Sequence, residues 1–313
     1  MTSTSKPQAR ETTFAEATTV SPIANKQNEF TANIPWDWSG EARAHGGYLA
    51  SVLLSTARAY FHQKNGNDSQ PDAVASHIQF LHPVTVGPAT LTVRELAPSK
   101  SYPCIQVELQ KEQKDGSIKT CVTAIITQNN LATEEGQTIK TPATVPKAEL
   151  PNRQTECYEY IQQDYMKKMF PMCMKTRTFY VNGGKNGRLN DRKGLHVREI
   201  WLGWTDQKQV FDVISLGTVC DTFLSAPTNF YDYEEDMKGL YMYPTLSLSL
   251  DIKKDPKDSK WLFMKIRTHK ILNGRFDQEV QVIDEEGDLV ALSKHVCRAV
   301  PLKGKKTQSR SNL

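Results

Sequence analysis

The chain repeats one order of secondary structure, and this repetition limits what it can fold into. In each half a helical segment precedes four strand-like stretches rich in Val, Ile and Thr, and a turn containing Asp and Gly separates the last two stretches. Placing Gly116 on Gly287 aligns the two halves with a difference of 171 residues. The strands are expected at 73–81, 89–96, 105–110 and 118–127, and again at 245–252, 261–269, 275–283 and 289–300. We therefore predict an internal duplication of one α+β unit.

Segments without hydrophobic periodicity divide the 313 residues into domains. Residues 1–28 are polar and rich in Thr and Ser, and we expect a disordered arm. Residues 131–155, rich in Thr, Pro and Glu, are expected to link a first domain at 29–130 to a second at 156–302. Residues 303–313 are expected to form a flexible basic tail.

Composition excludes several classes of function. The net charge of +4 with scattered Lys and Arg does not indicate a nucleic-acid partner. No apolar run approaches the roughly 20 residues that span a bilayer. The six cysteines are widely spaced and form no CxxC pair, which favours reduced thiols inside a cell over a metal site or a disulfide framework. We expect neither a metal nor another cofactor.

The two ends of the chain bear on its localisation. The first 20 residues lack the apolar core of a signal peptide, and we expect a cytoplasmic protein. The last three residues, Ser311, Asn312 and Leu313, differ at one position from the Ser-Lys-Leu signal for peroxisomal import. A peroxisomal location is therefore the alternative.

One acidic residue lies in an apolar helical pattern in the second half. Apolar residues recur at spacings of three and four around Asp221, and we expect a helix over 211–231 with this face toward the core. An ionised carboxylate is costly in such a place unless hydrogen-bond donors surround it. Asp221 is thus either a well-paired structural acid or a functional one.

The corresponding helix of the first half begins with glycines. Gly46 and Gly47 follow His45 at its start, where the first N–H groups have no partner within the helix. The absence of side chains there would let another group approach the backbone. A tight turn into the helix is the alternative interpretation.

Strand alternation predicts which side chains of the closing strand face inward. One face carries no formal charge and consists of Leu289, Ala291, Ser293, His295, Cys297 and Ala299. His295 is therefore expected to point toward the central helix, as a hydrogen-bonded core residue or as a proton donor and acceptor. The same alternation places Thr245 on the solvent side, unless the start of its strand is kinked.

These segments, in this order, resemble the acyl-CoA thioesterase II-like, or thioesterase-like, superfamily over residues 30–302. The segments similar to its signatures are 45–50, 77–84, the segment around Asp221, 245–250 and 290–300. The resemblance implies an α+β fold with two hot-dog domains in tandem, each an antiparallel sheet wrapped around a central helix.

The resemblance also implies a site. In that superfamily an Asp, a Thr or Ser and a Gln hold the water that hydrolyses an acyl thioester. By position, Asp221 matches the Asp and Thr245 the Thr, while His295 stands at the Gln position, which is a departure. The substrate implied is an acyl-CoA, or an acyl or polyketide chain on a carrier. Gly46 and Gly47, with His45 beside them, would polarise the thioester carbonyl.

Replacing Gln by His changes the chemistry that the site can support. Gln can only position a water, whereas an imidazole exchanges protons near neutral pH. His295 with Asp221 could thus serve hydrolysis or another acyl reaction, such as cyclisation, elimination or acyl transfer. A non-catalytic acyl-binding protein is the third interpretation. An exposed sheet edge would also allow copies of the chain to pair.

Overall fold

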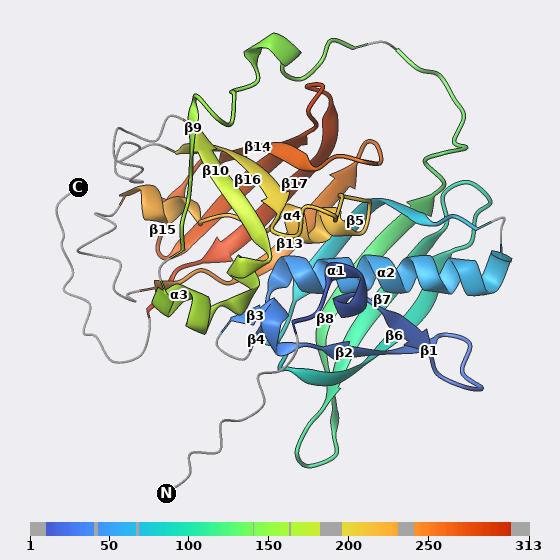
Figure 1. Ribbon diagram of the computed structural model, residues 1–313. Coiled ribbons are helices and arrows are strands. Elements are labelled where there is room, and N and C mark those ends of the chain that lie inside the picture. Colours follow the sequence, from blue (N-terminus) through green and yellow to red (C-terminus); the bar gives the residue numbers. More distant parts are fainter. Residues whose placement is uncertain are drawn as a thin grey trace, which may run out of the picture.

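The computed structural model describes most of the chain, and the two halves form one molecule (Figure 1). The described residues are 11–40, 43–66, 69–139, 141–162, 164–181, 196–230 and 241–301. The expected basic tail at 303–313, with Ser311 to Leu313, lies outside these ranges. Within them, no helix is both long and apolar enough to cross a membrane.

The first half wraps an antiparallel sheet around one long helix, α2 (Gly46–Asn65). Its strands are β1 (Val20–Pro22), β2 (Glu29–Ile34), β5 (Asp72–Phe80), β6 (Gly87–Ala97), β7 (Cys104–Glu112) and β8 (Ile118–Asn129). Short elements complete this half: α1 (Phe14–Ala17), η1 (Trp36–Trp38), β3 (Ser39–Gly40) and β4 (Arg43–Ala44). Leu53 and Ala57 of α2 are fully buried, because the apolar face of the helix lies against the sheet.

The second half repeats this sheet around a shorter helix, α4 (Ser215–Val219). Its long strands are β10 (Thr176–Val181), β11 (Val197–Trp204), β13 (Thr245–Ile252), β14 (Trp261–Arg267), β16 (Arg275–Ile283) and β17 (Leu289–Arg298). The smaller strands are β9 (Cys157–Glu159), β12 (Tyr241–Met242), β15 (Ile271–Leu272) and β18 (Val300–Pro301). The remaining helical turns are η3 (Lys147–Glu149), α3 (Asp164–Met169), η4 (Pro171–Met174) and η6 (Ala226–Phe230).

The two halves share one 14-stranded antiparallel sheet. Its main path runs β1-β2-β6-β7-β8-β5-β13-β17-β16-β14-β11-β10-β9. Strands β5 and β13 pair at the junction, where Ile78 lies opposite Leu248. This pairing brings α2 and α4 to the same side of the sheet, where they pack together (Figure 1).

The structure confirms the predicted α+β fold with two hot-dog units in tandem. Strands β7 and β16 have the same length and are 171 residues apart, as the alignment of the turn glycines predicts. Gly116 and Gly287 both adopt positive φ, 80° and 90°, which a side chain would disfavour.

The helix expected over 211–231 is much shorter, and this prediction is wrong in extent. Helix α4 ends at Val219, and Asp221 lies in the turn that follows. The apolar spacing continues to Leu224, but the N–H groups of Asp221 and Thr222 donate to the carbonyls three residues back, those of Thr218 and Val219, which ends the regular helix. Farther on, Pro227 lacks a backbone N–H and would break an α-helix over 226–230. A 3-10 turn, η6, takes its place.

The disordered arm expected over 1–28 is also wrong from residue 11 onward. Thr13 caps α1 in a capping box with Glu16. Phe14 is buried, with its ring centroid 5.6 Å from that of Trp38 and 5.1 Å from that of Trp204 in the second half. The polar composition of residues 1–28 does not indicate this one buried ring, which packs the arm against both halves.

The linker expected over 131–155 has contacts of its own with the second half. The N–H of Val145 donates to the carbonyl of Gly287 at 3.1 Å. The Arg153 guanidinium lies over the rings of Trp201 and Trp261, 5.3 and 4.3 Å from their centroids. These cation–π contacts hold the segment against the sheet.

Candidate active site

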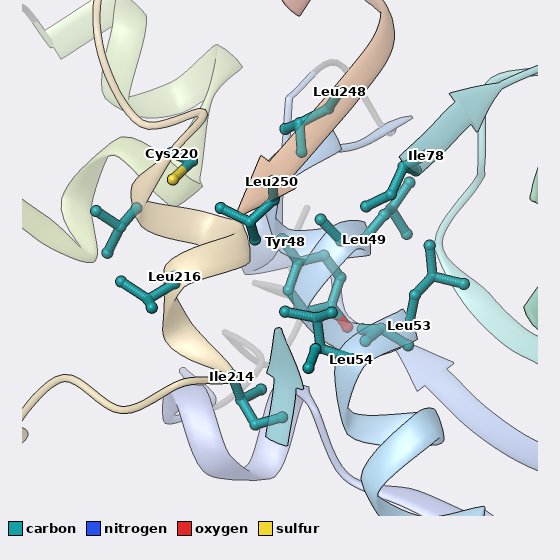
Figure 2. Packing of buried hydrophobic residues seen from close by; sticks show 14 of the residues in the cluster. Tyr48, Leu49, Leu53, Leu54, Ile78, Ile214, Leu216, Cys220, Leu248 and Leu250 are labelled. Atoms are coloured by element: carbon teal, nitrogen blue, oxygen red, sulfur yellow. The ribbon is translucent and has the colours of Figure 1, made fainter. Parts of the chain in front are cut away.

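The site forms where α2 and α4 cross. A Cβ on Gly47 would lie 2.7 Å from the Cβ of Asp221 and 2.9 Å from the carbonyl oxygen of Gly217, so only glycine allows this approach. The Ser51 hydroxyl donates to the Ile214 carbonyl at 2.7 Å and accepts the N–H of Thr218 at 2.9 Å. Apolar side chains of both helices and of β5 and β13 surround this crossing (Figure 2).

Asp221 receives hydrogen bonds from both halves of the chain. Its Oδ2 accepts the N–H of Gly47, in the first turn of α2, at 2.8 Å. Its Oδ1 accepts the hydroxyl of Thr245, at the start of β13, at 3.1 Å. The first N–H groups of α2 carry the positive end of the helix dipole, which favours an anion here. Only 10% of the Asp221 side chain is exposed, so these donors take the place of water in stabilising the ionised carboxylate.

Two histidines face this carboxylate from opposite sides. The Nε2 of His45, which precedes α2, lies 3.6 Å from Oδ2 of Asp221. The Nδ1 of His295, on β17, lies 3.5 Å from Oδ1. His295 is fully buried, as strand alternation predicts, and its Nε2 lies 2.9 Å from the Ser293 hydroxyl. The structure thus brings together His45 and His295, which are 250 residues apart.

Thr245 lies in the site, against the prediction from strict alternation. The pairing of β13 with β17 shifts register between Thr245 and Ser247, so that Cys297 faces the first and Val296 the second. Such a β-bulge turns one side chain to the opposite face of the sheet. The kink at the start of the strand therefore directs the Thr245 hydroxyl at Asp221.

Burial and the neighbouring side chains set the protonation states of Asp221 and His45. Burial by itself raises the pKa of Asp221, but His45, His295 and Thr245 outweigh burial and hold that pKa below its usual range. Burial lowers the pKa of His45; the charge of Asp221 opposes this, and His295 adds to it. Near neutral pH the centre is thus an ionised carboxylate beside a neutral His45.

The two glycines have different roles in this geometry. Both were expected to direct free N–H groups at a substrate carbonyl, but the Gly47 N–H is bound to Asp221. The Gly46 N–H has no partner among the described residues. A Cβ on Gly46 would lie 2.8 Å from Oδ2 of Asp221, so this donor is next to the carboxylate.

Several residues around the site were missed in the sequence. Gln278 of β16 is buried and lies directly across from His295. The ring of Phe223 covers His295 edge-on, with centroids 6.0 Å apart. Gln278 could have been found, because it shares a strand face with Phe276 and Val280 and is the polar residue among them.

Cys220 and Cys297, two buried cysteines of the second half, lie close to Asp221. Burial raises the pKa of the Cys220 thiol and that of the Cys297 thiol to about 12 each, which leaves both protonated and unreactive. In the ranges that the structure covers, no group of three or more His, Cys, Asp or Glu side chains could hold a metal ion.

Comparison with known proteins identifies the family. The N-terminal domain of acyl-CoA thioesterases matches residues 34–129, and the C-terminal domain matches residues 142–299. The thioesterase-like protein TwmA of Talaromyces wortmannii is 23% identical over 95% of each chain.

Solved structures share the fold. A putative thioesterase II from Thermobifida fusca superposes with a TM-score of 0.70 at 19% identity, covering 92% of this chain and 97% of that one. An inactive Asp-to-Asn mutant of the CurK dehydratase superposes with a TM-score of 0.54 at 7% identity, covering 92% and 97%. Because both domain matches lie in tandem and in order, the chain belongs to the acyl-CoA thioesterase family.

Proposed function

We propose that the chain hydrolyses an acyl thioester, either an acyl-CoA or an acyl or polyketide chain on a carrier, at a centre organised by Asp221. One observation carries this proposal: a nearly buried carboxylate receives the Gly47 N–H from one half and the Thr245 hydroxyl from the other. Ionised and fixed by these donors, it can orient a water for attack on a carbonyl carbon.

The second requirement of hydrolysis is a donor for the oxyanion. Attack on the thioester places negative charge on the carbonyl oxygen, which prearranged N–H groups stabilise. The Gly46 N–H, which has no partner among the described residues, lies at the positive end of α2 beside Asp221 and supplies such a donor. Thr245 and His295 hold the carboxylate in place, so that carboxylate, water and carbonyl meet in one geometry.

A second candidate is another acyl or polyketide reaction, such as elimination, cyclisation or acyl transfer. The observation that favours it is the pair of histidines at Asp221, since imidazole can move a proton on a carbon chain as well as on water. The likeness to a dehydratase shows a shared fold only, and therefore does not decide between the two reactions.

Release of free thiol distinguishes these functions. The purified chain is incubated with acyl-CoAs of several lengths and with acyl-pantetheine, and thiol and acyl product are both followed. Wild type is expected to release thiol, and Asp221→Ala is expected to lose at least about a hundredfold in kcat/KM. The control is Asp251→Ala, a half-exposed acid on β13 that pairs with Lys253.

Each outcome has a distinct meaning. Thiol release that survives Asp221→Ala would place the chemistry elsewhere. An altered acyl chain without released thiol would favour the second candidate. Saturable binding of acyl-CoA with no chemical change would instead indicate a binding protein.

A further inference from the structure

The two histidines at Asp221 differ in their access to a substrate. A group that takes a proton from a reacting water must lie within hydrogen-bond reach of it. The His45 ring is 27% exposed, whereas the His295 ring is completely enclosed. His295 is where the chain departs from the Gln of the superfamily. The difference in exposure nevertheless favours His45 as the histidine that contacts the reacting water.

His295 is enclosed by protein atoms, although its Nδ1 has no hydrogen-bond partner among the described residues. Its Nδ1 faces Asp221 and its Nε2 lies 2.9 Å from the Ser293 hydroxyl. Phe223 packs against the ring with its centroid 6.0 Å away. A water could reach this imidazole only if one of these contacts opened. The contacts instead suit a residue that fixes the orientation of the carboxylate.

His45 also has an unpartnered ring nitrogen, but its ring is partly open to solvent. It stands at the N-cap of α2, yet its side chain makes no capping hydrogen bond. Its Nε2 is 3.6 Å from Asp221, beyond ordinary hydrogen-bond length, and its Nδ1 is buried without a partner among the described residues. An unsatisfied buried nitrogen costs about 1–3 kcal/mol. This cost is explained if the ring exchanges hydrogen bonds with groups that arrive with water and substrate.

The electrostatics of His45 suit a base. The titratable groups that face it are Asp221, in the turn after α4, and His295, on β17. Burial and His295 keep the imidazole neutral near pH 7, so that a lone pair is available. Once the ring gains a proton, the ionised Asp221 lies next to the positive charge and stabilises it.

We propose that His45 exchanges the proton with the reacting water, and that His295 only positions Asp221. This inference rests on thioester hydrolysis as the proposed function. As the water oxygen bonds to the carbonyl carbon, one water proton passes to His45 and the carbonyl electron pair moves onto oxygen, beside the Gly46 N–H. When that pair returns, the carbon–sulfur bond breaks and His45 gives its proton to the thiolate. The products are a carboxylic acid and a free thiol.

The test compares conservative variants of three histidines in the full chain. His45→Gln and His295→Gln remove one imidazole each, and His62→Gln is the control, an exposed histidine near the end of α2. The pH dependence of kcat/KM is measured between about pH 5 and 9. Far-UV circular dichroism and Tm check folding, which His45→Gln should preserve because the ring caps nothing.

The proposal predicts a split between the two inner histidines. Wild-type activity should fall as the pH drops and His45 becomes protonated. His45→Gln should lose at least about a hundredfold and also lose this acidic limb. His295→Gln should lose less than about tenfold and keep the limb, since glutamine can still hold Asp221. His62→Gln should match wild type.

Two results would overturn it. Hydrolysis by His45→Gln within about threefold of wild type, with the acidic limb intact, would refute His45 while leaving thioester hydrolysis in place. If wild type releases no thiol, the proposed function fails, and NMR titration of the His45 ring decides instead. Its pKa should fall in Asp221→Asn, because the neighbouring negative charge is lost. An unchanged titration would show that the two groups are not coupled.

Discussion

The two halves share a backbone plan but differ in the side chains between helix and sheet. With β7 placed on β16, the second half has Asp221, Thr245, Ser293 and His295 where the first has Ala50, Val74, Val122 and Ala124. Ala50, Val122 and Ala124 are buried, so the first half is apolar where the second is polar. The duplication has therefore produced one polar centre and one ordinary core.

The apolar half nevertheless contributes to that centre. It supplies the Gly47 N–H to Asp221, and His45 beside it. The counterpart of Gly47 in the second half is Thr218, whose N–H is taken by the Ser51 hydroxyl instead of a carboxylate. The helix start of the apolar half thus serves the acid of the other half.

The largest effect is expected from placing an acid in the apolar half. Ala50→Asp buries a carboxylate at the position that corresponds to Asp221, where the counterparts of Thr245 and His295 are Val74 and Ala124, which offer no side-chain donor. An uncompensated buried charge costs about 3–5 kcal/mol, and chemical denaturation should show a loss of this size. Ser55→Asp, at a half-buried position of the same helix, is the control and should cost much less. Equal stability of the two variants would mean that the first half still accommodates an acid.

The next largest effect is expected at the helix crossing. Gly47→Ala puts a methyl group 2.9–3.0 Å from the carbonyl oxygens of Gly217 and Thr218, which are backbone atoms and cannot move aside. We expect a loss of about 3 kcal/mol together with most of the activity. Gly46→Ala meets only side-chain atoms, so it should cost less stability while still displacing Asp221. A Gly47→Ala protein with normal Tm would show that the helices can separate freely.

A smaller effect is expected when Thr245 is replaced by valine, the residue at the corresponding position of the first half, Val74. Thr245→Val keeps the shape of the side chain but removes the hydroxyl that donates to Asp221. A hydrogen bond to a charged group contributes about 1.5–3 kcal/mol, and kcat/KM should fall by about tenfold if this donor orients the carboxylate. Thr245→Ser retains the donor and should keep the activity. Identical kcat/KM for the Val and Ser variants would remove Thr245 from the site.

The smallest effect is expected when Ser293 is replaced by valine, the residue at the corresponding position of the first half, Val122. Ser293→Val takes away the hydroxyl beside Nε2 of His295 and should lower the free energy of unfolding by about 1 kcal/mol. Activity should change only a few-fold, because the contact of His295 with Asp221 remains. A loss of activity as large as that expected for His45→Gln would show that His295 does more than position the carboxylate.

The sequence predicts those residues of the centre that lie in a regular periodic pattern, and it does not predict features that depend on one irregularity or on residues distant in the chain. Asp221 is predicted because the apolar spacing around it continues past the end of α4, and His295 because strand alternation holds along β17. Strict alternation places Thr245 on the solvent face unless the strand start is kinked, and the bulge between Thr245 and Ser247 is that kink, although nothing in the residues 245–252 marks it. The ordered arm was missed because Phe14 is buried only by Trp38 and Trp204, which are distant in the chain.

The contact between the halves was the least predictable feature. The glycines before α2 indicated a close approach but not its partner, because Gly47 and Asp221 are 174 residues apart. His45 was noted only as a neighbour of these glycines. Its position at the carboxylate follows from the pairing of β5 with β13, which sequence periodicity does not encode.

The most direct test of a single centre on Asp221 is the kcat/KM of Asp221→Asn. Asparagine keeps the size of the side chain but removes the negative charge that orients water and stabilises protonated His45. With the acyl-CoA that wild type hydrolyses best, we predict a loss of at least about a hundredfold with an unchanged far-UV spectrum. Hydrolysis by Asp221→Asn at the wild-type rate would contradict the account.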